Sequence, residues 1–382
     1  MLRTLRTAAA VAAALAMGVV SPPSTPSASA APAAPAAPAA PAAPAAPAAP
    51  ADNSRAALRQ VVPGLLARYH VPGLAVSVVR GRRVDLTECF GVRRAGGAEP
   101  ISADTVFEAA SLSKPLVAYA AMRAVAERTL GLDRPLGGYL DRPYLSDPRG
   151  ARITVRQVLS HSSGLPNWAR GRPLAPDFEP GERWQYSGEG YVYLQRVLEK
   201  LAGQPLAELM RLRVLEPLGM RASGYVWREE YERTFASPHD RTGAPGAKER
   251  PREANAASSL HTTAPEYAAF VAALLDPAAH AALLPPAAAG AMLTPQVQVD
   301  APLGLWWGLG WGLEKWQGRL SFFHWGSNDG FRSFALGDPV SGDGLVVLTN
   351  GAAGLELMDE VVRAVDGREH PLFKFRMLHP QD

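Results

Sequence analysis

Segments with the pattern of β-strands occur at both ends of the sequence, and the residues between them, from 101 to about 300, have a mainly helical and loop-like pattern. Near the N-terminus, two runs of β-branched and apolar residues, 73–79 and 82–86, flank a tight turn at Gly81. Near the C-terminus, the pattern predicts an antiparallel meander of strands at residues 309–313, 320–325, 331–336 and 345–349. The sequence therefore predicts an α+β fold, in which an antiparallel sheet from both termini is flanked by helices and a mainly helical lobe is inserted.

Helical patterns account for much of the remaining sequence. The segments predicted as helices are 54–69, 155–159, 191–201, 266–275 and 355–365. The stretch 222–255 is polar and contains Pro and Gly, so we expect a loop that covers the functional site. A cleft between the sheet and the helical lobe is the natural place for that site.

Ser111 and Lys114 stand at the start of the apolar segment 116–122, which is predicted to be a buried helix. Residues three apart share one face of a helix, so we expect the hydroxyl and the amine to lie side by side. A serine hydroxyl becomes a good nucleophile when a base removes its proton, and a neutral lysine is such a base. Pro115 disfavours helical geometry at Lys114, so we expect the regular helix to follow a tight first turn.

Lysine is rare in this chain, because only five of its 39 Lys and Arg residues are lysines. Arginine cannot lose its proton in a protein, so general-base chemistry at position 114 requires lysine. Burial and the positive end of a helix both lower the pKa of a lysine. The alternative interpretation is a serine that caps a helix, followed by a solvated lysine one turn later.

The first 52 of the 382 residues differ in composition from the rest. Arg3 and Arg6 precede an apolar run at 8–20, and Ala28-Ser29-Ala30 follows, which is the pattern of a signal peptide over residues 1–30. The apolar run is too short to span a bilayer. Residues 31–52 repeat Pro-Ala-Ala and are predicted to be an extended linker. We therefore expect a secreted or extracytoplasmic protein whose folded domain is 53–382.

Charge and cysteine content exclude several classes of protein. The formal net charge is +3 and falls by two, to +1, when Arg3 and Arg6 leave with the signal peptide, so no nucleic-acid partner is expected. Cys89 is the only cysteine, so an internal disulfide is impossible, and we expect it to pack as a small apolar residue. The histidines lack the spacing of zinc ligands, and we expect no metal, no cofactor, no membrane span and a monomer.

Two further motifs follow Ser111 and Lys114 along the chain. Tyr186-Ser187-Gly188 precedes a predicted helix, and His324-Trp325-Gly326-Ser327 lies on a predicted strand before a turn. In this order, the three motifs resemble those of the serine β-lactamase and penicillin-binding protein superfamily, and most of all its class C β-lactamase and esterase-like branch. The resemblance covers about residues 53–367 and includes segments 159–166 and 308–312.

The resemblance implies a β-lactamase/transpeptidase-like fold and a role for each motif. Ser111 would be acylated, Lys114 would transfer protons, and Tyr186 would be the second member of the base. A phenol near an ammonium group loses its proton more easily, so Lys114 and Tyr186 are expected to titrate as one unit. The backbone N–H groups of Ser111 and Ser327 would form the oxyanion hole.

The resemblance also assigns the substrate-binding residues, which are His324, Trp325, Gly326 and Gly188 with Ser327. Two of them depart from the family pattern. Gly188 stands where an Asn is usual, and His324, which often is Lys, is expected to be only partly cationic near neutral pH. These departures, and the bulky ring of Trp325, fit esters and D-amino-acid peptides at least as well as β-lactams.

Several alternatives remain open at this stage. Trp306, Trp307, Trp311, Trp316 and Trp325 could pack beside the cleft or form a sugar-stacking platform. An α/β-hydrolase lacks support because Gln185 stands where a GxSxG motif needs Gly, and His161 is interpreted as structural. The sequence thus predicts an exported serine hydrolase that acts through an acyl-enzyme on an ester, β-lactam or D-amino-acid peptide carbonyl. The alternatives are a non-hydrolytic binding or sensor protein for penicillin or peptidoglycan fragments, and a sugar-binding wall protein.

Overall fold

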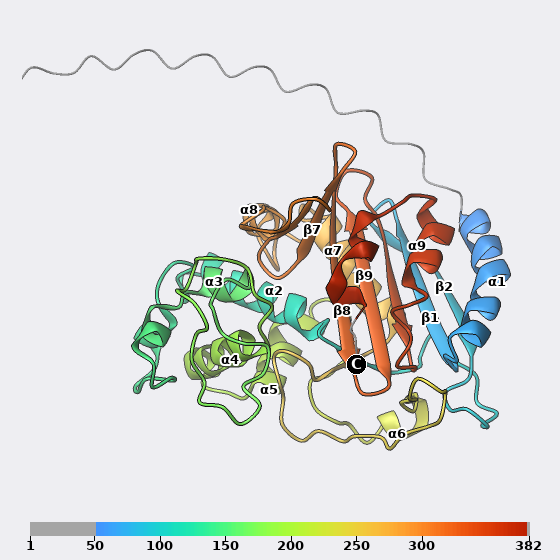
Figure 1. Ribbon diagram of the computed structural model, residues 1–382, viewed down its shortest axis with the longest axis horizontal. Helices are drawn as coiled ribbons and strands as arrows, with labels where there is room; N and C mark the ends of the chain where they lie inside the picture. Colours follow the sequence, from blue (N-terminus) through green and yellow to red (C-terminus); the bar gives the residue numbers. More distant parts are fainter. Residues whose placement is uncertain (1–50, 380–382) are drawn as a thin grey trace, which may run out of the picture. The chain divides into compact units, whose positions relative to one another are not determined.

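The computed structural model describes residues 51–379 (Figure 1). The predicted signal peptide, and the predicted linker apart from its last two residues, lie outside the described part of the chain. Among the residues that are described, no helix combines the length and the apolar character needed to cross a membrane.

One antiparallel sheet dominates the structure. Its eight strands, in spatial order, are β2 (Arg83–Gly91), β1 (Gly73–Arg80), β10 (Asp343–Thr349), β9 (Phe331–Asp338), β8 (Arg319–Asn328), β7 (Gly312–Trp316), β6 (Leu305–Trp307) and β5 (Val297–Asp300). Strand β1 pairs with β10, and Val76 lies opposite Val347. The blue N-terminal strands and the orange C-terminal strands therefore share one sheet (Figure 1), which confirms the predicted α+β fold.

Helices cover both faces of the sheet because side chains alternate along its strands. Leu345 and Val347 of β10 point into one core, which contains α1 (Ala51–Arg68) and α9 (Met358–Asp366). Val346 and Leu348 point into the other core, which contains α7 (Ala264–Leu275) and the helical lobe. In a sheet that is buried on both faces, each strand is apolar along its whole length, and its successive side chains enter the two cores in turn.

The helical lobe joins the sheet through the segment after β2. Its main helices are α2 (Ser113–Ala126), α3 (Val155–Leu159), α4 (Gly188–Ala202) and α5 (Leu206–Met210). Helix α4 begins where Ser187 accepts a hydrogen bond from the Gly190 N–H, and it ends at Gly203, whose φ is +65°. The end of this helix agrees with the predicted helix at 191–201, and its start lies three residues before the predicted one.

The structure differs from the prediction mainly in short elements. A two-stranded sheet of β3 (Phe107–Ala110) and β4 (Leu260–Thr262), and strands β5 and β6, were not predicted. The strand predicted at 309–313 is wrong except for its last two residues, because β7 begins at Gly312 after a loop. Segment 222–255 contains only the single-turn helix α6 (Tyr231–Thr234) and is otherwise irregular, as predicted. Helix α8 (Pro286–Met292) completes the set of α-helices among the described residues.

Candidate active site

Ser111 lies in a tight turn between strand β3 and helix α2, not on the helix itself. The helix begins at Ser113, and the Lys114 N–H donates to the Ser111 carbonyl at 3.0 Å. Ala110 has a φ of +49°, a conformation that costs energy in a residue with a side chain. The Ser113 hydroxyl donates to the Ala110 carbonyl at 2.6 Å and holds this turn closed. The tight first turn expected from Pro115 is present, and it leaves the Ser111 side chain half-buried.

The Lys114 side chain lies beside the Ser111 hydroxyl, as the spacing predicts. Its Nζ atom is 2.9 Å from Ser111 Oγ and 2.9 Å from the carbonyl oxygen of Ala257. Burial lowers the pKa of the Lys114 amine from its ordinary value to about 7, because a buried ammonium loses its hydration. The neutral amine is therefore accessible near neutral pH, and the alternative of a solvated lysine is wrong because the side chain is buried.

Tyr186 lies over the same amine. Lys114 Nζ is 4.7 Å from the centre of the Tyr186 ring, and the ring centres of His161 and Trp325 are 4.3 Å and 5.4 Å from that of Tyr186. Burial raises the pKa of the Tyr186 hydroxyl well above its ordinary range, and the nearby Ser111 side chain offsets only part of this effect. The prediction that this phenol loses its proton easily is therefore wrong, because the stacked rings exclude the water that a phenolate needs.

His324 is fully buried beside the amine and is neutral. Its Nδ1 donates to the Trp325 carbonyl at 2.8 Å, while Nε2 has no hydrogen-bond partner among the described residues. Burial, and then the charge of Lys114, lower the pKa of His324 to about 3. The prediction of a partly cationic His324 is therefore wrong. This side chain offers a lone pair to the site and no positive charge.

Strand β8 presents a free edge at Ser327. Gln317 and Gly318 have φ values of +48° and +76°, so they form a two-residue turn between β7 and β8. The residues that flank such a turn, Trp316 and Arg319, form a hydrogen-bonded pair. Counting from that pair, every second residue of β8 directs its backbone groups toward β7, and this series includes Phe323 and Ser327. The pairing ends where Gly312 faces Phe323, so the Ser327 N–H points to a side where β7 no longer runs.

The strand and the Ser111 turn approach closely because residue 326 is glycine. A Cβ atom on Gly326 would lie 2.2 Å from Ser333 Oγ and 2.4 Å from the Ala109 carbonyl oxygen. The backbone N–H of Ser111 has no hydrogen-bond partner among the described residues. Two donors, on Ser111 and on Ser327, therefore lie on adjacent segments with no competing backbone partner, as an oxyanion hole requires.

Gly188 stands where the family usually has Asn, and neighbouring residues fill the space that an Asn side chain would occupy. A Cβ atom here would lie 2.8 Å from the Asn167 carbonyl oxygen and 2.8 Å from the Trp168 ring. The Asn167 side chain also accepts a hydrogen bond from the Gly188 N–H at 3.0 Å. The space of the usual Asn is thus occupied by residues 167 and 168.

Several residues of the site were missed or left without a role by the sequence. The Ala257 carbonyl that binds Lys114 could not be predicted from the sequence, because every residue has a backbone carbonyl. Glu108 Oε2 accepts from Asn328 Nδ2 at 2.7 Å, and burial raises the pKa of Glu108 to about 7. His161 accepts from the Ser187 N–H at 3.0 Å and holds the segment after Tyr186, so its structural interpretation agrees with its position.

Three of the five tryptophans of the predicted cluster pack inside the protein, while Trp306 is half-buried and Trp316 is 40% exposed. Trp307 and Trp311 are fully buried, and Trp325 is 4% exposed. These three rings are therefore unavailable as a platform for sugars, and packing explains them. Among residues 51–379, no group of three or more His, Cys, Asp or Glu side chains is placed to hold a metal ion. Cys89 is half-buried on β2, and burial raises the pKa of its thiol to about 11.

Comparison with known families identifies the family of this chain. The sequence profile of the family described as Beta-lactamase matches residues 58–366. The chain belongs to this family. That membership places it among the β-lactamase-related serine hydrolases, and the β-lactamase-family motifs at Ser111, Tyr186 and His324 all lie within the matched region.

Individual relatives in the beta-lactamase family carry several different names. Penicillin-binding protein 4 of Amycolatopsis lactamdurans is 28% identical over 79% of this chain and 87% of its own length. Esterase EstB of Burkholderia gladioli is 32% identical over 48% of this chain and 55% of its own length. A Beta-lactamase of Pseudomonas fluorescens is 26% identical over 51% of this chain and 57% of its own length. The chain thus spans little more than half of the last two relatives.

Two solved structures have the same fold. The octameric penicillin-binding protein homologue from Pyrococcus abyssi superposes with a TM-score of 0.71 at 22% identity, over 85% of this chain and 80% of that one. The D-alanine carboxypeptidase AmpC from Burkholderia cenocepacia gives 0.69 at 22% identity, over 83% and 98%. The predicted β-lactamase/transpeptidase-like fold is therefore confirmed.

Proposed function

We propose that the protein is an exported serine hydrolase in which Ser111 attacks a substrate carbonyl and forms an acyl-enzyme. The observation that carries the proposal is the 2.9 Å contact between Lys114 Nζ and Ser111 Oγ in a site where burial lowers the pKa of the amine to about 7. A neutral Lys114 takes the Ser111 proton as the Ser111 oxygen bonds to the carbonyl carbon. The negative charge on the carbonyl oxygen is then stabilised by the N–H groups of Ser111 and Ser327.

In this proposal, Tyr186 acts as a protonated phenol. Because burial keeps the pKa of its hydroxyl high, Tyr186 donates a hydrogen bond or a proton and does not serve as a base at neutral pH. The protonated Lys114 returns its proton to the leaving group, directly or through Tyr186. Water, activated by Lys114 once it is neutral again, then releases the acyl group from Ser111.

Among the three substrate classes, we place esters first and keep β-lactams and D-amino-acid peptides as the others. A neutral His324 supplies no charge for a substrate carboxylate, and Gly188 supplies no side-chain amide for a substrate amide. An ester substrate that has no carboxylate and no amide needs neither a cationic side chain nor a side-chain amide in the site. Trp325 and Gly326 then define the wall beside the acyl group.

A panel of substrates on the purified protein tests this proposal. We expect a short p-nitrophenyl ester to turn over, and nitrocefin and a D-amino-acid amide to turn over more slowly, with all three activities absent from Ser111→Ala. If none of the substrates is released faster than by Ser111→Ala, the hydrolase proposal is wrong.

A second candidate is a protein that is acylated and releases the product very slowly, as a penicillin or cell-wall fragment sensor would. The high pKa of Tyr186 favours it, because deacylation then has one base, Lys114. A fluorescent penicillin that stays bound to Ser111 for hours, without release of product, would identify this function.

Export and a monomeric state are also proposals. The signal-peptide pattern of residues 1–30 supports export. We expect the N-terminus of the protein recovered from the medium or cell envelope to begin near residue 31, and light scattering after gel filtration to give the mass of one chain.

A further inference from the structure

The segment that follows helix α9 reaches the wall of the active site. It consists of residues 370–378 and contains two short 3-10 helices, Pro371–Lys374 and Arg376–Leu378. This segment lies beyond residue 366, where the match to the beta-lactamase family ends. The family match therefore does not describe this segment, and its contribution to the site follows from its own contacts.

Phe375, between the two short helices, touches the rings that flank Tyr186. Its ring centre is 5.8 Å from that of Trp184 and 5.9 Å from that of Trp325, and its side chain is buried. Trp325 in turn stacks on Tyr186 with an angle of 27° between the rings, and Trp184 is 6.5 Å from Tyr186. Phe375 thus lies behind two of the rings that fix where the phenol can be.

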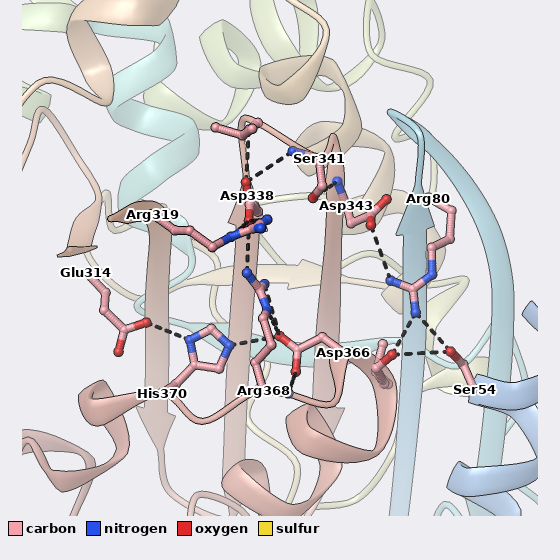
Figure 2. A network of polar contacts seen from close by, with 12 residues as sticks. Ser54, Arg80, Glu314, Arg319, Asp338, Ser341, Asp343, Asp366, Arg368 and His370 are labelled. Carbon is pink, nitrogen blue, oxygen red and sulfur yellow. Dashed lines mark hydrogen bonds and ion pairs between the residues drawn. The ribbon is translucent and has the colours of Figure 1, made fainter. Parts of the chain in front are cut away.

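Buried charges attach the start of this segment to the sheet (Figure 2). His370 bridges two carboxylates, with Nδ1 2.6 Å from Glu314 on β7 and Nε2 2.8 Å from Asp366 on α9. The Leu372 N–H also donates to Glu314 at 2.8 Å. Arg368 extends the network to Asp338 on β9, at 2.9 Å. The segment is therefore anchored at one end and packs its aromatic residues against the core beyond.

The Tyr186 hydroxyl interacts with the Ser111 side chain, but it has no hydrogen-bond partner of standard geometry among the described residues. The rings around Tyr186 therefore contribute much of what holds it in place. His161 and Trp325 both pack against the Tyr186 ring, with ring centres 4.3 Å and 5.4 Å away. Loss of the support behind Trp325 leaves that ring, and with it Tyr186, room to move.

We propose that Phe375 is a positioning residue, which acts through Trp184 and Trp325 to hold the Tyr186 phenol against Lys114 and Ser111. This inference rests on the proposed function, because it concerns the geometry of the same catalytic groups. A displacement of about 1 Å in such a group lowers the rate about 100-fold. The Phe375 ring would thus affect turnover without touching the substrate.

Substitution of Phe375 tests the inference, with Phe373 as the matched control. Phe373 lies two residues away, is similarly buried, and packs against Phe334, at 5.2 Å between ring centres, instead of against the tryptophans. We expect Phe375→Ala to lower kcat about 10- to 100-fold with little change in KM, and Phe373→Ala to lower the melting temperature similarly with kcat within about threefold of the wild type. Phe375→Met, which preserves most of the volume, should recover most of the kcat and guards against a failure of Phe375→Ala to fold.

Equal losses of kcat in Phe375→Ala and Phe373→Ala would overturn the inference, because the segment would then act only through stability. A second measurement keeps this result separate from a failure of the proposed function. Near-ultraviolet circular dichroism reports the packing of the tryptophans whether or not any substrate is turned over. We expect Phe375→Ala to change this spectrum more than Phe373→Ala, and identical spectra for the two variants would also overturn the inference.

Discussion

The Lys114 amine donates a hydrogen bond to the main-chain oxygen of Ala257 at 2.9 Å, and the Ser111 hydroxyl lies 2.9 Å from the same nitrogen. A carbonyl oxygen only accepts hydrogen bonds, so one N–H of a neutral amine is occupied by Ala257. The lone pair of that amine is then free to accept the Ser111 proton. The Ala257 carbonyl thus accepts a hydrogen bond from the Lys114 amine and also orients its lone pair toward Ser111.

The first prediction concerns the pH dependence of acylation. Burial lowers the pKa of Lys114 to about 7, and only its neutral form accepts a proton. We therefore expect kcat/KM to rise with pH through a midpoint near 7 and to level off above about pH 8. The measurement is the initial rate with a p-nitrophenyl ester between pH 5 and 9.

Glu108 provides the control for this midpoint, because burial also raises its pKa to about 7 and it contacts Asn328 beside Ser327. We expect Glu108→Gln to leave the midpoint in place. Loss of the midpoint in Glu108→Gln would assign the titration to the carboxyl group instead of the amine.

The second prediction separates the role of Lys114 in catalysis from its role in the fold. Methionine has nearly the volume of lysine and no charge, so the buried site should accept it. We expect Lys114→Met to lose about 10³-fold or more in kcat/KM while its melting temperature stays within about 3 °C of the wild type. A variant that loses both activity and stability would mean that the amine is mainly structural.

The third prediction concerns Gly326, which lets strand β8 approach the Ser111 turn. A Cβ atom there would overlap Ser333 Oγ at 2.2 Å and the Ala109 oxygen at 2.4 Å. We expect Gly326→Ala to cost about 1–3 kcal/mol of unfolding free energy and about 100-fold in kcat/KM, since the Ser327 N–H moves with the strand.

The matched control is Gly290 in helix α8, which has no atom within 4 Å of a built Cβ. Gly290→Ala should be neutral or more stable by about 0.5–1 kcal/mol, because alanine is the better helix former. Urea unfolding measures both variants, and equal stability of the two would show that the strand has room at residue 326.

The fourth prediction concerns the pair Gly188 and Trp168. Because a Cβ atom on residue 188 meets the Trp168 ring at 2.8 Å, Gly188→Asn should lose about 1–3 kcal/mol of stability and should not gain β-lactam turnover. The double variant Gly188→Asn with Trp168→Ala should be more stable than expected from the sum of the two single changes. Additive losses in a double-mutant cycle by urea unfolding would show that the two residues do not compete for space.

The fifth prediction concerns the stability of the protein in mild alkali. Burial disfavours the His370 cation, but hydrogen bonds to Asp366 and Glu314 more than offset this and raise its pKa to about 9. The unfolded chain loses this proton near pH 6.5, so the stabilisation is complete below that pH and disappears as the pH rises through about 9. A rise in the pKa from 6.5 to about 9 corresponds to about 3 kcal/mol.

Thermal unfolding between pH 6 and 10 measures this effect. The melting temperature should fall by about 5–10 °C more in the wild type than in His370→Gln, which has no proton to lose. Parallel curves for the two proteins would show that the network in Figure 2 keeps its strength without the charge on His370.

Local relationships were predicted well from the sequence, and relationships across the fold depended on the family resemblance. The contact between Ser111 and Lys114 follows from a spacing of three residues, and helix α4 ends one residue beyond the predicted helix at 191–201. Nothing in the residue types indicates that Tyr186 packs against both His161 and Trp325, because that arrangement needs three distant segments of chain.

The errors in predicted pKa values have one physical cause. The pKa expected for Tyr186 assumed that a nearby ammonium group dominates, and the pKa expected for His324 assumed contact with water. Both side chains are at least 90% buried, and desolvation is the largest effect on each. Burial depends on the packing of the whole domain, which a motif does not report.

The pairing of β1 with β10 also determines when the central sheet can be completed during synthesis and folding. The ribosome makes β1 (Gly73–Arg80) long before β10 (Asp343–Thr349), so during synthesis β1 can pair with β2 but has no neighbour on its other side. An unpaired strand edge readily binds a strand of another chain. A growing polypeptide of this kind therefore needs protection from aggregation until its last strand arrives, and its central sheet closes as one of the final steps of folding.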